Sequence, residues 1–207
     1  MFAHRGLYTD DRTENSMSAI IAGLKHSRYD GVEVDVRFTR DGVAVLMHDG
    51  SWKRTHRSQN KKVYIKDFYY EELLKDVHPP IATLEAVLDA AKTYGKTVVV
   101  DFKPVSKRLF DSVLPLLVRR SEQVVFVILW FNYPLIQREL PFKIFRGLDS
   151  ANPSRATLRR MEKRGFDGVS MRYEGKISNH PTTLDVNVYV PPHVGFVPDA
   201  RWHSVTL

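Results

Sequence analysis

Two carboxylates and a histidine between residues 31 and 49 have the types and spacing to do chemistry together. Glu33 and Asp35 alternate with valines, and in a β-strand this period of two sends both carboxylates to one face. They repel each other there unless a cation lies between them, and a divalent, oxygen-preferring metal is the simplest candidate. His48 follows the next apolar run and is suited to proton transfer near neutral pH. An edge hairpin with a solvated acidic face would give the same pattern, and this stretch alone does not separate the two interpretations.

The two strands of this segment, 31–37 and 43–47, admit two arrangements. A tight hairpin at Asp41-Gly42 would place His48 opposite Asp35. A parallel arrangement with a short return would also bring His48 beside the carboxylates. Both arrangements predict the same neighbours, so the choice stays open.

The elements that must position these groups follow from the rest of the pattern. Further strands are predicted at 1–4, 97–102, 124–130, 142–148, 168–171 and 186–190. Helices are predicted at 16–26, 70–74, 83–94, 106–120, 133–140 and 153–164. Strands and helices alternate from residue 81 onward, which is typical of parallel strands with helical crossovers. Eight strands predict an α/β fold, a small (β/α)₈ TIM-type barrel in one domain over 1–207, with an open doubly wound sheet as the alternative.

A short insertion follows the third strand at about residues 50–80. It is polar, basic and aromatic, and a loop of this length inside a compact domain is unusual unless it has a function. We expect it to lie near the site; a mobile surface insertion is the alternative. After residue 190 the sequence does not predict how the barrel closes.

Both architectures place active groups at the carboxyl ends of parallel strands. The predicted strand ends carry polar and aromatic side chains: His4, Arg5, Glu33, Asp35, His48, Asp49, Asp101, Lys103, Trp130, Arg172 and Tyr173. A strand-end histidine or an Asp101–Lys103 ion pair has an ordinary structural explanation when taken singly. Their gathering at the same end of consecutive strands predicts a shared site.

The chemistry that needs this set is phosphodiester cleavage. Glu33, Asp35 and Asp101 are predicted to bind one Mg²⁺ or Ca²⁺, which would polarise a phosphoryl oxygen. His4 and His48 are the candidate general acid and base.

Three more strand-end residues are candidate substrate contacts. Arg5 and Lys103 would neutralise charge that develops on the phosphoryl oxygens. Trp130 would contact the substrate at the same rim.

Composition limits the classes of protein. The 207 residues contain no cysteine, which excludes disulfides, zinc–thiolate sites and thiol nucleophiles. The net charge of +7 favours anionic partners, although most of the basic residues are expected on solvated helix faces. No apolar run approaches membrane-spanning length and no signal-peptide pattern is visible, so a cytoplasmic protein is expected.

Several ordered motifs in residues 1 to about 105 resemble the glycerophosphodiester phosphodiesterase family, within the phosphatidylinositol-phospholipase-C-like phosphodiesterases. They are Ala3-His4-Arg5-Gly6, Glu14-Asn15-Ser16, 31–36, 39–42, 45–49, Arg54-Thr55, Glu72-Leu73, 81–88 and 101–103. The resemblance implies a barrel and metal-dependent hydrolysis of glycerophosphodiesters to an alcohol and glycerol 3-phosphate, through a cyclic phosphate formed by the neighbouring glycerol hydroxyl. It assigns the same roles to the metal-ligand, histidine and phosphate-binding candidates named above, and orienting roles to Glu14 and Asn15.

One departure leaves a second enzyme open. Asp101 stands where the family usually has glutamate, and Asp-x-Lys is similar to spider-type sphingomyelinase D enzymes. The alternative is therefore a phospholipase D-like enzyme acting on lysophospholipids or sphingomyelin at a membrane surface. Its lipid contacts would be the aromatic residues of the insertion, Trp52, Tyr64, Phe68, Tyr69 and Tyr70. A non-catalytic phosphate-binding protein is disfavoured, because binding alone does not need two histidines. Binding of nucleic acid is disfavoured, because no recognised nucleic-acid-binding module is present in the sequence.

Overall fold

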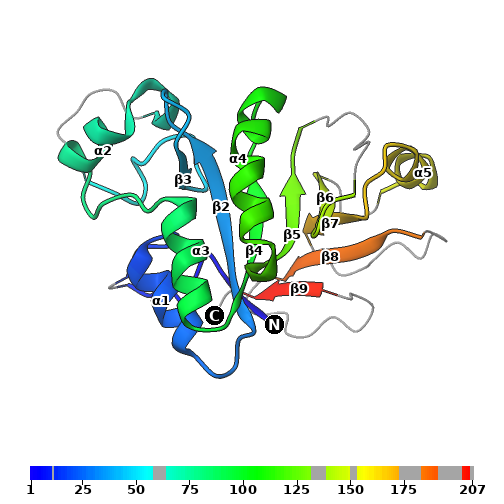
Figure 1. Cartoon of the computed structure of the whole chain (residues 1–207), viewed down its shortest axis with the longest axis horizontal. Helices are drawn as coiled ribbons and strands as arrows, with labels where there is room; N and C mark the ends of the chain where they lie inside the picture. Colours follow the sequence, from blue (N-terminus) through cyan, green and yellow to red (C-terminus); the bar gives the residue numbers. More distant parts are fainter. Residues whose placement is uncertain are drawn as a thin grey trace.

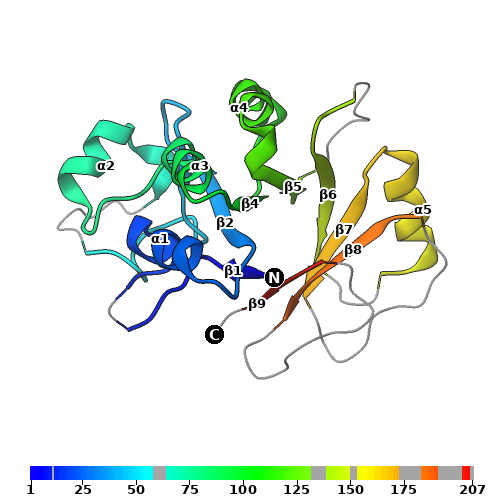
Figure 2. The ribbon, with the colours of Figure 1, turned by 60° about the horizontal axis from the view of Figure 1, so that its bottom comes forward.

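The computed structural model describes residues 1–10, 12–57, 64–131, 139–149, 153–172, 183–190 and 202–205, with the backbone alone for 172, 187–190 and 202–205. Eight parallel strands in these ranges pair side by side (Figures 1 and 2). They are β1 (Phe2–His4), β2 (Gly31–Phe38), β4 (Thr97–Phe102), β5 (Val124–Leu129), β6 (Lys143–Leu148), β7 (Gly168–Arg172), β8 (Asp185–Val190) and β9 (Trp202–Val205). Because β1 pairs with both β2 and β9, the sheet closes on itself, and the predicted α/β TIM-type barrel is confirmed.

The membership of the barrel differs from the prediction at two strands. β3 (Ala44–Leu46) was counted as the third barrel strand, but it pairs antiparallel with β2 on one side and lies outside the ring. The eighth place belongs to β9, which the sequence did not predict. The predicted number of barrel strands is therefore right, but one of the eight predicted strands, β3, does not belong to the barrel.

The β2–β3 hairpin also has a different register from the tight turn considered above. Met47 lies opposite Asp35, with its backbone N–H 2.9 Å from the Asp35 carbonyl oxygen, so the prediction for His48 in a two-residue hairpin is wrong. The turn is wider because Thr39 pairs with Val43: the Val43 N–H donates to the Thr39 hydroxyl at 2.9 Å, and the Thr39 N–H to the Val43 carbonyl at 3.1 Å.

Helices cover the outside of the curved sheet (Figure 2). They are α1 (Met17–Lys25), α3 (Leu84–Thr93), α4 (Lys107–Arg119) and α5 (Arg155–Lys163). Each begins after a hydroxyl side chain that accepts a backbone N–H of the first turn, from Ser16, Thr83, Ser106 and Ser154 respectively. The predicted helix at 133–140 lies mostly outside the described residues, and its last two residues are not helical.

The insertion folds around a hydrophobic cluster of its own. Trp52 and Phe68 are 1% and 6% exposed and pack with apolar residues of the β2–β3 hairpin and of α2 (Tyr70–Asp76), next to a 3₁₀ turn at Ile65–Asp67. The expectation that Trp52 and Phe68 contact lipid is therefore wrong, because their rings already fill this cluster. Tyr64 and Tyr69 are 54% and 45% exposed.

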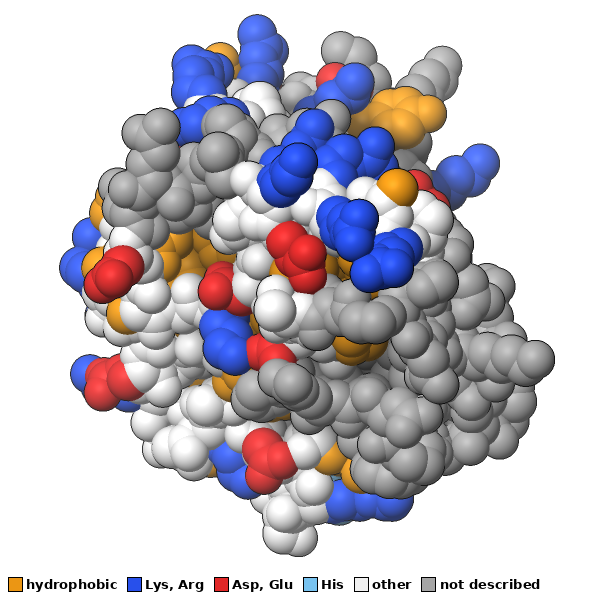
Figure 3. Space-filling model, turned by 90° about the vertical axis from the view of Figure 1, so that its right-hand side faces the viewer, with side chains coloured by type: hydrophobic (Ala, Val, Ile, Leu, Met, Phe, Trp, Pro, Cys, Tyr) orange, Lys and Arg blue, Asp and Glu red, His pale blue; other side chains and the backbone are white. Residues whose placement is uncertain are grey.

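The surface of the described part is strongly basic on one side. α5 exposes a row of cationic side chains, Arg155, Arg159, Arg160 and Lys163. Lys and Arg side chains gather on the face that carries this helix (Figure 3). Among the described residues, no helix combines the length and the apolar character needed to cross a bilayer.

Candidate active site

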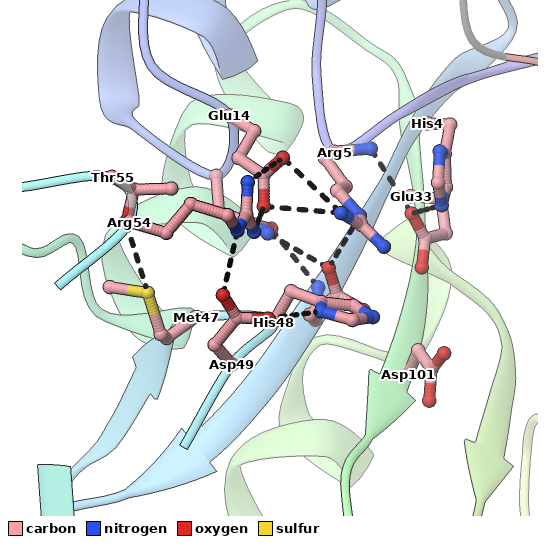
Figure 4. A network of polar contacts seen from close by, with 12 residues as sticks. His4, Arg5, Glu14, Glu33, Met47, His48, Asp49, Arg54, Thr55 and Asp101 are labelled. Carbon is pink, nitrogen blue, oxygen red and sulfur yellow. Dashed lines mark hydrogen bonds and ion pairs between the residues drawn. The ribbon is translucent and has the colours of Figure 1, made fainter. Parts of the chain in front are cut away.

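Three carboxylates meet inside the mouth of the barrel and form what we call the inner carboxylate cluster: Glu33, Asp35 and Asp101. Glu33 and Asp35 lie on the same face of β2, and Asp101 of β4 is the register partner of Asp35. Each residue offers an oxygen within 4.8 Å of the others, and all three are at most 1% exposed. The structure thus brings these three residues together at the strand ends, and their binding of a metal ion stays a prediction. Glu33 and Asp101 are labelled in Figure 4.

Two cations contact the inner carboxylate cluster. The Lys103 ammonium nitrogen lies 2.6 Å from Asp35 Oδ1 and 3.0 Å from Asp101 Oδ2. Arg5 Nε lies 3.1 Å from Asp35 Oδ2, and the Arg5 backbone N–H donates to Glu33 Oε2 at 3.1 Å. Lys103 and Arg5 therefore offset part of the negative charge that would otherwise accumulate in a buried site.

A tight turn after β1 aims Arg5 at the cluster. Arg5 and Gly6 both have positive φ, 58° and 79°, and a Cβ on Gly6 would come within 2.7 Å of the Ala19 backbone in α1. Only glycine fits at position 6, because the chain turns against α1 there. This conformation points the Arg5 backbone N–H toward Glu33.

Asn15 fixes Asp35 through two hydrogen bonds. Its amide Nδ2 donates to Asp35 Oδ2 at 2.8 Å, and its Oδ1 accepts the Asp35 backbone N–H at 3.1 Å. Asn15 adopts the left-handed φ of 56°, which asparagine tolerates better than most residues. The orienting role that was expected for Asn15 therefore has a direct structural basis.

The surroundings shift the pKa values of the cluster in opposite directions. Burial, and then the neighbouring Asp35 and Asp101 carboxylates, raise the pKa of Glu33 well above its usual range. Burial acts in the same direction on Asp35, but the Lys103 and Arg5 charges outweigh it and hold the pKa of Asp35 below its usual range. The same carboxylates raise the pKa of Lys103 against the effect of burial.

The inner carboxylate cluster fits a divalent metal ion. Glu33 Oε1 is buried and, within the described part of the chain, has no hydrogen-bond partner. A buried carboxylate oxygen without a partner is costly, and a hard cation bound by oxygen ligands would satisfy it.

His4 lies beside the cluster at the end of β1. Its Nε2 is 3.7 Å from Glu33 Oε2, and its side chain is 17% exposed. Burial, assisted by the Arg5 charge, lowers the pKa of His4 to about 4. The imidazole is therefore neutral at pH 7 and has the form that accepts a proton.

A second set of charges lies further out, and we call it the outer ion-pair network: Glu14, Asp49 and Arg54. Arg54 Nη2 is 2.6 Å from Glu14 Oε1, and Arg54 Nε is 2.7 Å from Asp49 Oδ2. Asp49 Oδ1 in turn lies 2.8 Å from His48 Nδ1. Arg5 joins the two sets, because its Nη1 contacts Glu14 at 3.1 Å (Figure 4). Asp49 thus contacts one ring nitrogen of His48, Nδ1, and orients the ring.

Sequence reasoning gave Arg54 no role in the site. The only signal was the Arg54-Thr55 pair among the family-like motifs. Arg37 was also missed: its guanidinium donates two hydrogen bonds, at 2.9 and 2.7 Å, to the His48 carbonyl oxygen. Arg37 thereby fixes the backbone that carries His48.

Trp130 contacts a carboxylate of the cluster rather than open solvent. Its indole N–H donates to Asp101 Oδ1 at 2.5 Å, and the Lys103 ammonium lies 5.5 Å from the ring centroid. Its role as a substrate contact stays a prediction. Tyr173 and the side chain of Arg172 lie outside the described residues.

The sequence profile of the glycerophosphoryl diester phosphodiesterase family matches residues 4–134. The chain belongs to this family. The matched segment contains both histidines, the inner carboxylate cluster and the outer ion-pair network. The family resemblance expected from the sequence is confirmed.

Relatives of this family agree with the assignment. A glycerophosphodiester phosphodiesterase of Bacillus altitudinis is 31% identical over 147 residues, which is 70% of this chain and 51% of that protein. Human glycerophosphodiester phosphodiesterase 1 is 38% identical over 73 residues, which is 35% of this chain and 20% of the human protein. The chain therefore spans about half the length of the Bacillus altitudinis relative, and a fifth of the human one is matched.

Solved structures with the same fold come from this family. The crystal structure of a Thermotoga maritima glycerophosphodiester phosphodiesterase has a TM-score of 0.66 and 21% identity, covering 90% of this chain and 83% of that one. An Oleispira antarctica phosphodiesterase, solved in complex with the product sn-glycerol-3-phosphate, has a TM-score of 0.62 and 18% identity over 90% and 82% of the two chains. At these identities the likeness supports the fold.

Proposed function

We propose that the protein hydrolyses glycerophosphodiesters to an alcohol and glycerol 3-phosphate with the help of a divalent metal ion. The observation that carries the proposal is the meeting of three buried carboxylates, two cations and His4 at the carboxyl ends of barrel strands, with His48 added by the segment after β3, outside the ring. Membership of the family adds support, as does the product bound to the Oleispira antarctica phosphodiesterase.

Each group has a role that its surroundings support. Glu33, Asp35 and Asp101 would hold Mg²⁺ or Ca²⁺, and the ion would supply a Lewis acid for the phosphoryl oxygens. Arg5 and Lys103 bind and orient the phosphate while they remain paired with carboxylates of the site.

The histidines move the proton. His4 and His48 come from different segments, β1 and the chain after β3, so they reach the reacting phosphate from separate positions. One accepts the proton of the attacking glycerol hydroxyl and the other donates a proton to the leaving alcohol oxygen, which leaves a cyclic phosphate. In the second step the roles reverse, and water opens the ring to give glycerol 3-phosphate. Asp49 keeps the His48 ring in one orientation.

Phospholipase D-like cleavage of lysophospholipids or sphingomyelin, the alternative reading of the sequence, has less support. Two of the aromatic side chains invoked for lipid contact, Trp52 and Phe68, are buried in the insertion. A small diester substrate needs no such contact. We therefore keep a soluble phosphodiester as the proposed partner and no nucleic acid.

The test is hydrolysis of glycerophosphocholine, with lysophosphatidylcholine in parallel, each in Mg²⁺, in Ca²⁺ and in excess chelator. Release of glycerol 3-phosphate that the chelator abolishes is the expected result. Choline release from the lysolipid alone would replace the proposal with the phospholipase D-like activity. No product from either substrate with either metal would reject hydrolysis of these diesters.

A further inference from the structure

A pocket of about 410 Å³ opens beside the candidate active site, on the side of the insertion. Two of its lining residues are close in the chain to residues of the site: Pro104 follows Lys103, and Gly50 is two positions after His48. Arg37 belongs to both places, because it lines the pocket while it donates to the His48 carbonyl. On β2, Arg37 also follows Asp35 on the same strand face, one step closer to the mouth of the barrel. The pocket is therefore an extension of the reaction site.

The charged side chains that line this pocket are all positive. Among its described lining residues, Arg37 and Lys66 are the charged ones and none is acidic. Arg37 is half-buried, and no carboxylate of the described part forms an ion pair with it. Arg37 uses Nε and Nη2 for the His48 carbonyl, and its other guanidinium N–H groups can bind an anionic group of a substrate.

The position of the pocket says which part of the substrate it would hold. Glycerol and the reacting phosphate are common to all glycerophosphodiesters, and the proposed site for the phosphate is the inner carboxylate cluster with its two cations. The part that varies is the alcohol, and a pocket lined by Gly50 and Pro104, which adjoin His48 and Lys103 in the chain, lies on the side to which the alcohol would extend. Its volume falls within the usual range of small-molecule sites, roughly 300–1,000 Å³.

We infer that this pocket is a subsite for the alcohol and that it selects diesters whose alcohol carries a second negative charge. The inference rests on the proposed function and deepens it by naming a substrate class. A quaternary ammonium alcohol would meet Arg37 and Lys66 with like charge. The exposed ring of Tyr64 offers such a cation an aromatic face, but the two positive charges in the same pocket oppose its binding.

The test compares two substrates that differ by one phosphate group, glycerophosphoinositol 4-phosphate and glycerophosphoinositol. The ratio of their kcat/KM values should favour the phosphorylated diester by about fivefold to tenfold at low ionic strength, and less at high salt. Lys66→Glu should abolish this ratio. Arg37 is not substituted, because it also holds the backbone of His48.

A matched control is Lys75→Glu. Lys75 is an exposed lysine of the same insertion, outside the pocket, so its reversal changes the net charge equally. This variant should keep the substrate preference. Equal kcat/KM values for the two diesters in the unaltered protein would overturn the inference, as would an equal loss of preference in both variants.

A binding measurement separates this inference from the proposed function. Titration calorimetry in excess chelator, without turnover, should give a Kd for glycerophosphoinositol 4-phosphate about fivefold to tenfold below that for glycerophosphoinositol. If the two Kd values differ in this way but no diester is hydrolysed, the proposed reaction is rejected and the pocket for an anionic group is retained. Hydrolysis of glycerophosphocholine with equal binding of the two inositol diesters would reject the pocket alone.

Discussion

The inner carboxylate cluster and the outer ion-pair network use the same side-chain chemistry in different surroundings. In the cluster all three carboxylates are at most 1% exposed, whereas Asp49 and Arg54 of the outer network are 33% and 51% exposed. Water screens Asp49 and Arg54, so their ion pair contributes little to stability, whereas Glu14 of the same network is buried. The buried charges interact strongly with one another: the neighbouring carboxylates help to raise the pKa of Glu33, and Lys103 and Arg5 lower the pKa of Asp35. We therefore expect the buried inner carboxylates to take part in the chemistry and the exposed pair Asp49–Arg54 to position His48.

Removing one charge from the cluster should have the largest effect. For Asp35→Asn we expect kcat/KM on glycerophosphocholine to fall by more than about 10³-fold, because the site loses a metal ligand and the partner of Lys103 and Arg5. Steady-state rates across a metal titration measure this.

The control for Asp35→Asn is stability. Lys103 keeps Asp101 and Arg5 keeps Glu14 as partners, so we expect the free energy of unfolding to change by about 1–3 kcal/mol. Asp89→Asn, at an exposed carboxylate on α3, should leave activity unchanged. Rates near those of the unaltered protein for Asp35→Asn would contradict the assignment of the cluster as the catalytic centre.

Substitution of each histidine tests whether proton transfer needs both regions, because His4 contacts the inner carboxylate cluster and His48 contacts Asp49 of the outer network. We expect His4→Ala and His48→Ala each to lower kcat by about 10²–10⁴-fold while thermal unfolding stays cooperative. If both variants kept near-normal kcat, the acid–base assignment would be rejected.

The two regions also differ in how far the sequence predicted them. The cluster was predictable because the alternation on β2 fixes the face of Glu33 and Asp35, and the strand-end rule adds Asp101. Glu14 and Arg54 are 40 positions apart in irregular segments, where no periodicity relates them. Their contact depends on how the insertion packs.

The errors in the fold have similar causes. The four-residue strand β9 has no apolar run to reveal it, and it exists through its pairing with β1 and β8. The register of β3 depends on one hydroxyl, that of Thr39, which widens the turn. Trp52 reads as an exposed aromatic residue in a polar insertion, but a second core of residues distant in the chain buries it. In each case tertiary contacts decided the outcome where local pattern was weak.

The raised pKa of Glu33 predicts that the affinity of the inner carboxylate cluster for a metal ion depends on pH. We expect no such dependence from the outer ion-pair network. A metal ligand must be ionised, and Glu33 in the metal-free protein holds its proton to higher pH than an ordinary glutamate. Metal affinity should therefore rise with pH, by up to about tenfold per unit, until the Glu33 pKa is passed. Without metal the native state binds the extra proton, so this carboxyl's contribution to stability falls as pH rises over the same interval.

Calorimetry of metal binding in buffers with different protonation heats counts the released protons. About one proton should be released per ion at a pH below the Glu33 pKa, and Glu33→Gln should bind the ion more weakly and with less proton release. Binding that is independent of pH in the unaltered protein would contradict the raised pKa as the controlling feature.

The smallest expected effect belongs to the outer network. Arg54→Ala removes the contacts of Arg54 with Glu14 and Asp49, so Asp49 holds the His48 ring less firmly. We expect kcat to fall about fivefold, with KM nearly constant and a stability change below about 1 kcal/mol, because Arg54 is half exposed. Lys53→Ala, at the exposed neighbouring position, is the matched control and should change neither parameter. A loss as large as that of Asp35→Asn would mean that Arg54 contacts the reacting phosphate directly, and the division between chemical and positioning charges would then fail.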